Sequence, residues 1–250
     1  MTDSAKAWSE STAVEYYAKY RHQVSDLYPS EKVFLPRVLF PGARVLDVGC
    51  ASGGFFNIMR TLEPAIDYTG IDIAEPSIEA ARQLYPDSNA KFMVTDGLKI
   101  PFDDDEFDLV HCTSVLVIEP RYQDVLREMY RVSKRFVLAD MRLLNGPDAV
   151  GSSEDSRYRI QFEGEFEGTT VPYVVSDADE VVNFILSLDP KPQALRGAGY
   201  FHPVSPMAQT PYPEVCMTIF LLQKGDGGVD KTELEIHDLP LEFSIDSQYL

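Results

Sequence analysis

The sequence has little positive charge and little cysteine. It carries 22 lysine and arginine residues against 40 aspartate and glutamate residues, a net charge of −18. A chain with this excess of negative charge repels nucleic-acid phosphates and anionic lipid surfaces. We therefore expect neither nucleic acid nor a membrane as a partner. The three cysteines, Cys50, Cys112 and Cys216, are odd in number and far apart, which indicates free thiols in a reducing compartment.

Long apolar runs and targeting signals are also missing. No stretch reaches the roughly 20 apolar residues that a membrane-spanning helix needs. The first ten residues, MTDSAKAWSE, lack the basic and apolar regions of a signal peptide. These features predict a cytoplasmic protein. Four histidines and three scattered cysteines show no metal-ligand spacing, so we predict no metal site.

The chain does contain a regular alternation of strand and helix patterns. With 250 residues, 44% of them apolar, it is long enough for one domain with a sizeable core. Apolar runs typical of buried strands alternate with amphipathic helical segments. This order is typical of βαβ units in a parallel sheet that helices cover on both faces. The predicted strands are 43–49, 67–73, 91–96, 107–112, 135–140 and 214–224.

The regions before and after this alternation are less regular. Residues 1–40 have helical spacing, with Val14, Tyr17, Val24 and Tyr28 on one face, and we predict a helical cap there.

Between strands five and six, residues 144–213 form a predicted substrate-side insertion that contains a hairpin over 158–175. Its aromatic and acidic residues suggest either a cover over a neutral or cationic small molecule or a hairpin packed on the sheet edge. Together these regions give a predicted domain over 1–224, followed by a C-terminal extension over 225–250 whose structure the pattern does not predict.

The stretch VLDVGCASGGF at 45–55 indicates a ligand-binding loop. It places Asp47 at the end of a buried strand and follows it with small residues that permit close backbone approach. In an open parallel sheet, ligands bind beyond the carboxyl ends of the strands. A dinucleotide fingerprint would require glycine where Ala51 stands. A carboxylate at 47 would also repel a diphosphate and attract an ammonium group, so the loop favours a ligand with an amino-acid-like end.

Two further acids end neighbouring strands. Asp72 follows YTGI, 19 residues after Gly53, and an acid at this distance can accept hydrogen bonds from both hydroxyls of a ribose. The alternative is an acid that caps the helix beginning near Pro76. Asp96 ends the third strand and could accept a hydrogen bond from an adenine amino group, or lie in a solvated turn.

In combination, the motifs VLDVGCASGG, YTGIDIAEPSIEAAR, VTDGLKIPFDDDEFDLVHC and VLREMYRVSK resemble those of class I S-adenosylmethionine-dependent methyltransferases of the small-molecule type. The resemblance covers residues 40–142, and EVCMTIFLLQK is similar to the final strand of that family. It implies a Rossmann-like, seven-stranded, mostly parallel sheet with helices on both faces, an antiparallel final strand and an N-terminal helical cap. The implied cofactor is S-adenosylmethionine and the implied partner is a small-molecule acceptor.

The resemblance also implies roles for individual residues. Asp47 and Gly49 would hold the methionine moiety, Asp72 the ribose hydroxyls, and Ile73 the adenine ring, while Asp96 and Gly97 would meet the adenine edge and Cys112 would present backbone to the amino-acid end. Tyr16, Tyr20 or Arg21 would touch the cofactor carboxylate, with core packing as the alternative for each tyrosine.

The sequence offers no clear general base. Where members of the family often carry histidine after the fourth strand, this chain has SVLVIEPRY, and Glu119 there is suited to capping the next helix. His111 lies within a strand and has the character of a core histidine, and His202 is the better candidate. The alternatives to a methyltransferase are a non-catalytic protein of the same fold, a nicotinamide-dependent dehydrogenase and an aminopropyl transferase.

Overall fold

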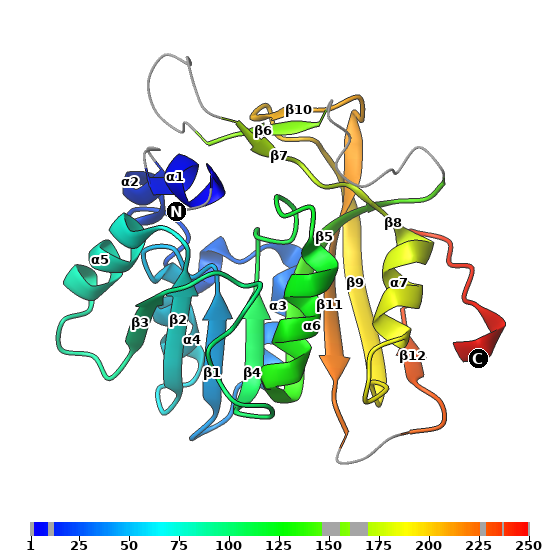
Figure 1. Ribbon diagram of the computed structural model, residues 1–250, viewed down its shortest axis with the longest axis horizontal. Helices are drawn as coiled ribbons and strands as arrows, with labels where there is room; N and C mark the ends of the chain where they lie inside the picture. The colour runs from blue at the N-terminus through cyan, green and yellow to red at the C-terminus, as the bar shows by residue number, and fades with distance from the viewer. Residues whose placement is uncertain are drawn as a thin grey trace.

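The structure is a computed structural model that describes residues 3–9, 13–146, 156–160, 170–225, 229–236 and 238–249. Its main feature is a mixed sheet, in which the described residues provide nine strands (Figure 1). Five parallel strands form one half, in the order β3-β2-β1-β4-β5. They are β1 (Arg44–Val48), β2 (Asp67–Asp72), β3 (Lys91–Val94), β4 (Phe107–Cys112) and β5 (Ser133–Leu144). β2 pairs with β1 on one side, and β4 pairs with β1 on the other. Because the chain connections diverge there, a crevice opens at the carboxyl ends of β1 and β4.

The other half of the sheet contains the antiparallel strand. β11 (Glu214–Gln223) lies between β5 and β9 (Ala194–Pro203) and is antiparallel to both. β12 (Glu233–Glu235), from the C-terminal extension, pairs parallel with β9, and the short β8 (Ser176–Asp177) pairs with β5. The mostly parallel sheet with an antiparallel strand at 214–223 is therefore confirmed. The predicted number of seven strands was too small by β8 and β12.

Helices cover both faces of the sheet. α6 (Tyr122–Val132) and α7 (Ala178–Leu186) pack on one face and share a core with Leu46, Val110 and Phe220. α3 (Pro29–Val38), α4 (Gly54–Leu62) and α5 (Glu75–Leu84) contribute to a second core that includes Tyr68 and Leu109. In Figure 1, α6 and α7 lie in front of the sheet, and α3 and α4 lie behind it. The prediction of helices on both faces is confirmed.

The N-terminal region consists of short helices. α1 (Asp3–Ser9), α2 (Ala13–Tyr17) and the 3-10 helix η1 (Val24–Asp26) precede α3. The single helical face predicted over 14–28 is therefore wrong. Arg21 has a positive φ of 64°, which a continuous helix does not allow. Pro29 disfavours helical geometry at Tyr28, the residue before it, and α3 begins at Pro29.

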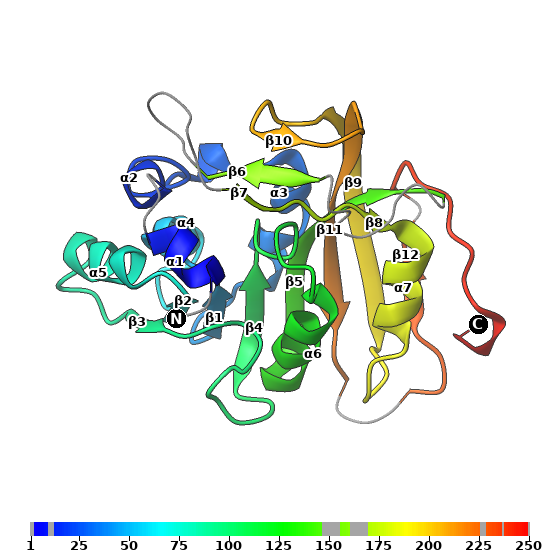
Figure 2. The same cartoon turned by 45° about the horizontal axis from the view of Figure 1, so that its top comes forward.

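A second, small sheet lies above the carboxyl ends of β4 and β5 (Figures 1 and 2). Its strands are β10 (Ala208–Gln209), β6 (Arg157–Arg159) and β7 (Thr170–Pro172), in that order. β6 and β7 pair antiparallel, as predicted for a hairpin, while the acidic segment 161–169 between them lies outside the described residues. The small sheet packs with α1 through Ala7, Ile160 and Val171. It forms a roof over the end of the main sheet.

The C-terminal extension passes beside α7, where Asn183 hydrogen-bonds with Ser244 and Asp246, and it ends in the 3-10 helix η2 (Ser247–Tyr249). Its Leu239 is buried against β9. Among the described residues we find no helix with the length and apolar character needed to cross a lipid bilayer.

Candidate functional site

A cavity of about 840 Å³ lies between the carboxyl ends of the parallel strands and the roof. Its volume is near the upper end of the roughly 300–1,000 Å³ that single small-molecule sites occupy. The loops after β1, β2, β3 and β4 form one part of its wall. The N-terminal helices, the roof and the ends of β5, β9 and β11 form the other part.

The loop after β1 is held in a tight conformation. Gly49 has φ +78° and Gly53 has φ +81°, values that favour glycine. A Cβ atom at Gly49 would overlap Cγ2 of Val115. Ala51 takes a positive φ of 46°, which costs an alanine about 1 kcal/mol or more. The backbone N–H of Ala51 donates a hydrogen bond to Asp72 at 3.0 Å, which fixes the loop against the end of β2.

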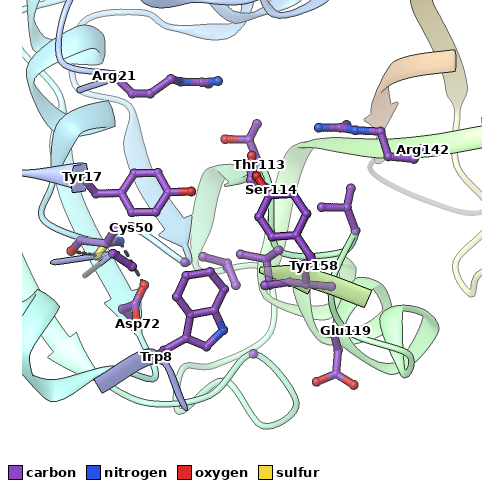
Figure 3. A pocket seen from close by; sticks show the side chains of 18 of the residues that line it. Trp8, Tyr17, Arg21, Cys50, Asp72, Thr113, Ser114, Glu119, Arg142 and Tyr158 are labelled. Atoms are coloured by element: carbon purple, nitrogen blue, oxygen red, sulfur yellow. Dashed lines mark hydrogen bonds between the residues drawn. The ribbon is translucent and has the colours of Figure 1, made fainter. Parts of the chain in front are cut away.

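Asp72 faces the cavity from the end of β2 (Figure 3). Its Oδ2 accepts from the Ala51 N–H and its Oδ1 accepts from the Ala74 N–H at 2.8 Å. Burial disfavours the charged form and raises the pKa of Asp72 from 3.8 to about 6, although these backbone hydrogen bonds oppose the shift. The carboxylate is thus held in place and is mostly ionised at neutral pH. Its bond to Ala74 reaches the residue before α5, and α5 itself has no side-chain cap hydrogen bond.

The structure brings five of the seven predicted cofactor residues to the cavity wall: Gly49, Asp72, Ile73, Asp96 and Gly97. Asp96 also stabilises its own turn, because its Oδ1 accepts from the backbone N–H groups of Leu98 and Lys99, each at 3.1 Å. Both roles considered for Asp96 are therefore compatible with its position.

Asp47 and Cys112 do not border the cavity. The Asp47 side chain is 2% exposed and accepts hydrogen bonds from the Tyr68 hydroxyl and, at 2.7 Å, from Nδ1 of His111. Successive strand residues point to opposite faces, and Asp47 lies on the face that α3 and α4 cover. The expectation that its carboxylate holds an ammonium group directly is therefore corrected: Asp47 binds a core histidine and a tyrosine. Cys112 is fully buried, and the next residue, Thr113, borders the cavity instead.

Three arginines border the cavity: Arg21, Arg121 and Arg142. Arg21 and Arg142 lie on opposite sides of it (Figure 3). Arg21 lies 2.6 Å from Glu31 and places its guanidinium over the rings of Tyr28 and Phe55, 4.1 and 5.1 Å from their centroids. Arg142 lies 2.8 Å from Asp140. Burial raises the pKa of Glu31, and Arg21 opposes that shift.

Sequence reasoning named Arg21 as a candidate but missed Arg142. The signal that could have found it is the segment ADMRLL, in which Asp140 and Arg142 are two charged residues on one face of an apolar strand. Charged side chains in a buried strand are costly unless they pair with each other or serve a function.

The candidate bases lie at the rim. Oε1 of Glu119 accepts from the backbone N–H of Arg121, the residue before α6, at 2.9 Å, while α6 itself has no side-chain cap hydrogen bond. His202 is exposed, and its Nδ1 lies 2.6 Å from the carbonyl oxygen of Pro203. His111 lies in the core, as its strand position indicated. Within the described ranges, no three histidine, cysteine or acidic side chains gather as a metal site would require.

A cavity of about 840 Å³ at the crossover of a parallel sheet, with a glycine-bent loop and a strand-ending acid, defines a Rossmann-like cofactor-binding domain. The sequence pattern of the methyltransferase domain family matches residues 39–179, and the chain belongs to this family. The predictions of a methyltransferase domain and of S-adenosylmethionine as the family's methyl donor are confirmed.

Curated relatives match part of the chain. A phthiotriol/phenolphthiotriol dimycocerosates methyltransferase from Mycobacterium tuberculosis is 33% identical over 105 residues, which are 40% of this chain and 38% of the relative. A fatty-acid O-methyltransferase from Mycolicibacterium smegmatis is 36% identical over 92 residues, 36% of this chain and 33% of the relative. The matched region thus spans about a third to two fifths of the length of these relatives.

Solved structures share the fold. A SAM-dependent methyltransferase from Methanosarcina mazei has a TM-score of 0.54 at 20% identity, covering 79% of this chain and 98% of that one. The [4+2]-cyclase SpnF has a TM-score of 0.52 at 16% identity, covering 78% of this chain and 80% of that one. Both are likenesses of fold alone, and they carry different activities.

Proposed function

We propose that this protein transfers the methyl group of S-adenosylmethionine to an oxygen, nitrogen or carbon atom of a small, largely apolar molecule. The observation that carries the proposal is the division of one cavity into two ends. The loop after β1 and the strand-ending acids form one end, while the roof and the ends of β5, β9 and β11 form the other. Such an arrangement suits a donor and an acceptor that must lie side by side.

The residues at the first end fit the cofactor. The bend at Gly49 leaves backbone at the cavity wall where a side chain would not fit. In this proposal the Asp72 carboxylate accepts hydrogen bonds from the ribose hydroxyls, Ile73 packs against adenine, and Asp96 and Gly97 border the adenine edge. Arg21, beside Phe55 and the glycine loop, is suited to the methionyl carboxylate, because guanidinium binds carboxylate in a fixed, bidentate geometry.

The cofactor, when bound, supplies a methyl group activated by a sulfonium. The chain's own part is to align the acceptor with the C–S bond and to exclude water, which can contribute about 7–11 kcal/mol to lowering a barrier in favourable cases. The bond from carbon to the acceptor atom forms as the bond from carbon to sulfur breaks. With Glu119 and His202 at the rim, the proposal favours an acceptor that reaches the site with its nucleophilic atom already unprotonated.

The nature of the acceptor is inferred from the cavity and from the relatives. The acceptor end is lined by aromatic and aliphatic side chains, among them Val117, Tyr158, Tyr173 and Met217. The relatives are named for lipid-like substrates, including a fatty acid and a 2-methyl-6-phytyl-1,4-hydroquinone. We include in the proposal that the acceptor is a small molecule and not a nucleic acid, since the net charge of −18 disfavours binding of polyanions. The proposal also includes that the protein acts in the cytoplasm.

Calorimetric titration of the full chain with S-adenosylmethionine, S-adenosylhomocysteine and NADH tests the first step. We expect binding of the two sulfur-containing ligands and none of NADH. Binding of NADH alone would favour the dehydrogenase. Binding of S-adenosylmethionine without radiolabelled methyl incorporation into any cellular small-molecule extract would favour a non-catalytic protein or a different reaction on the same fold.

A further inference from the structure

Arg142 lies in a row of side chains that forms the floor of the acceptor end. On β11, Met217 pairs in register with Arg142 of β5 and with Tyr200 of β9. All three residues border the cavity. Paired residues on neighbouring strands point to the same face of a sheet. Met217 therefore lies between Arg142 on one side and Tyr200 on the other.

The Arg142 guanidinium is fixed from behind. Its Nη1 donates to Oδ2 of Asp140 at 2.8 Å and lies 3.3 Å from the Met141 carbonyl oxygen, and its side chain is 9% exposed. The other oxygen of Asp140 accepts from the backbone N–H of Ser114 at 2.6 Å. Asp140 is 4% exposed and does not border the cavity. The acid thus orients the guanidinium, while Arg142 itself borders the cavity.

The charged residues of the cavity wall are separated along its length. In Figure 3, Arg142 extends toward the cavity from one side, whereas Asp72 and Glu119 lie well away from it. Tyr173 also borders the cavity and is close enough to Arg142 for the guanidinium to oppose the rise in its pKa. Its ring stacks on Tyr158 with centroids 5.9 Å apart. Burial raises the pKa of both tyrosines, so their hydroxyls are neutral groups that can donate hydrogen bonds.

We propose that the acceptor is an aromatic or aliphatic carboxylic acid and that Arg142 binds its carboxylate. This inference rests on the proposed function. A guanidinium offers five N–H donors in a planar fork that matches a carboxylate, and in a partly buried setting such charge-assisted bonds are strong. The apolar body of the ligand would then lie along Met217, Tyr200 and the Tyr158–Tyr173 stack. The earlier expectation of a neutral or cationic acceptor came from acids at 163–167, which lie outside the described residues.

The test compares matched ligands on the protein saturated with S-adenosylhomocysteine. The probes are decanoate, decanamide and decyltrimethylammonium, together with 4-butylbenzoate and 4-butylbenzamide. For the unaltered protein, we expect each carboxylate to bind at least tenfold more tightly than its amide, and the ammonium compound to bind weakly. In R142Q the preference for carboxylate over amide should fall to about twofold or less. R142K should retain part of it, because it keeps the charge but loses the fork.

R127Q is the matched control. Arg127 lies on α6 with its side chain 55% exposed and pairs with Asp124 outside the cavity, so its removal should leave the preference unchanged. Equal binding of acid and amide, tighter binding of the cation, or no binding of any probe would overturn the inference. S-adenosylhomocysteine affinity is measured in each variant. If the unaltered protein does not bind it, the proposed function itself fails; if it binds and the carboxylate preference is absent, only the Arg142 assignment fails.

Discussion

Asp72 shows how a single residue can serve a ligand at the expense of the fold. Its pKa is raised mainly by burial, so ionising it opposes folding. Relative to the unfolded chain, the stability it provides is complete below pH 3.8, and it is lost as the pH rises through about 6. At neutral pH the protein therefore maintains an ionised carboxylate in an unfavourable setting, which is reasonable where that carboxylate binds a partner.

Replacing Asp72 with asparagine should weaken S-adenosylhomocysteine binding by about 10- to 100-fold. The reason is that hydrogen bonds to a charged group contribute about 1.5–3 kcal/mol. The measurement is calorimetry at pH 7.5. D67N is the matched control, since it removes the same charge from the first residue of the same strand, where Asp67 is 3.8 Å from exposed Lys91. Equal losses in the two variants would show that net charge, and not the ribose contact, sets the affinity.

The same carboxylate predicts a pH dependence. Because the pKa of Asp72 is about 6, lowering the pH from 7.5 to 5 should protonate most of it and reduce affinity for S-adenosylhomocysteine by about tenfold. Titrations between pH 5 and 8 check this. The D72N variant should give a nearly flat profile over that range. A profile of the same shape in both proteins would assign the dependence to another group.

Asp47 shows where residue-level prediction stops. The motif correctly located the loop and the acid before it, but the acid's partners come from Tyr68 and His111, which lie 21 and 64 positions further along the chain. Which strands become neighbours decides which face a side chain shares, and local pattern does not contain that information. Ile73, Asp96 and Gly97 were easier to predict because parallel strands end at one edge, whatever their partners.

At the scale of elements, the loop after β1 depends on glycine at position 49. G49A should destabilise the fold and weaken cofactor binding, because its Cβ would overlap Val115 in addition to the cost of a positive φ. G42A is a matched control: Gly42 has φ +81°, close to the +78° of Gly49, but nothing within 4 Å of the added atom. We expect G42A to cost about 1–2 kcal/mol from backbone strain alone and G49A to cost clearly more.

Chemical unfolding of both variants, followed by calorimetry of the folded protein, separates the two effects. If G42A and G49A lose the same stability and retain the same affinity for S-adenosylhomocysteine, then Val115 moves aside and the close approach has no role.

Strand β9 was not located from the sequence, and its residues explain why. The segment ALRGAGYFHP contains two glycines, which are unfavourable in a strand interior. In the structure, added Cβ atoms at Gly197 and Gly199 would lie 2.6 and 2.8 Å from Leu239. The glycines thus accommodate a side chain about 40 residues further along the chain. By contrast, β1, β2, β4 and β11 were predicted close to their observed bounds, and β11 is a long, mainly apolar run.

At the scale of the whole molecule, the net charge of −18 and the cavity arginines Arg21 and Arg142 act over different distances. The arginines are each paired with a buried acid, so their effect is confined to groups in direct contact. The remaining excess of acids produces a negative potential around the protein, which decays over about 8 Å at physiological ionic strength. This field acts on ligands before they enter the cavity and can change their association rates.

This negative potential should affect the association of S-adenosylmethionine and of S-adenosylhomocysteine differently. S-adenosylmethionine carries one more positive charge than S-adenosylhomocysteine, because its sulfur is a sulfonium. We expect its association rate to fall several-fold between 20 and 500 mM salt, while that of S-adenosylhomocysteine changes by less than about twofold. Stopped-flow fluorescence can measure both rates, with neutral osmolyte at matched osmolality as the control for effects other than screening. Parallel salt dependence of the two ligands would mean that the surface acids do not steer the cofactor, and that its charge is recognised only after entry. A fall confined to S-adenosylmethionine would show that the acidic composition, besides disfavouring polyanions, speeds the arrival of the methyl donor relative to its product.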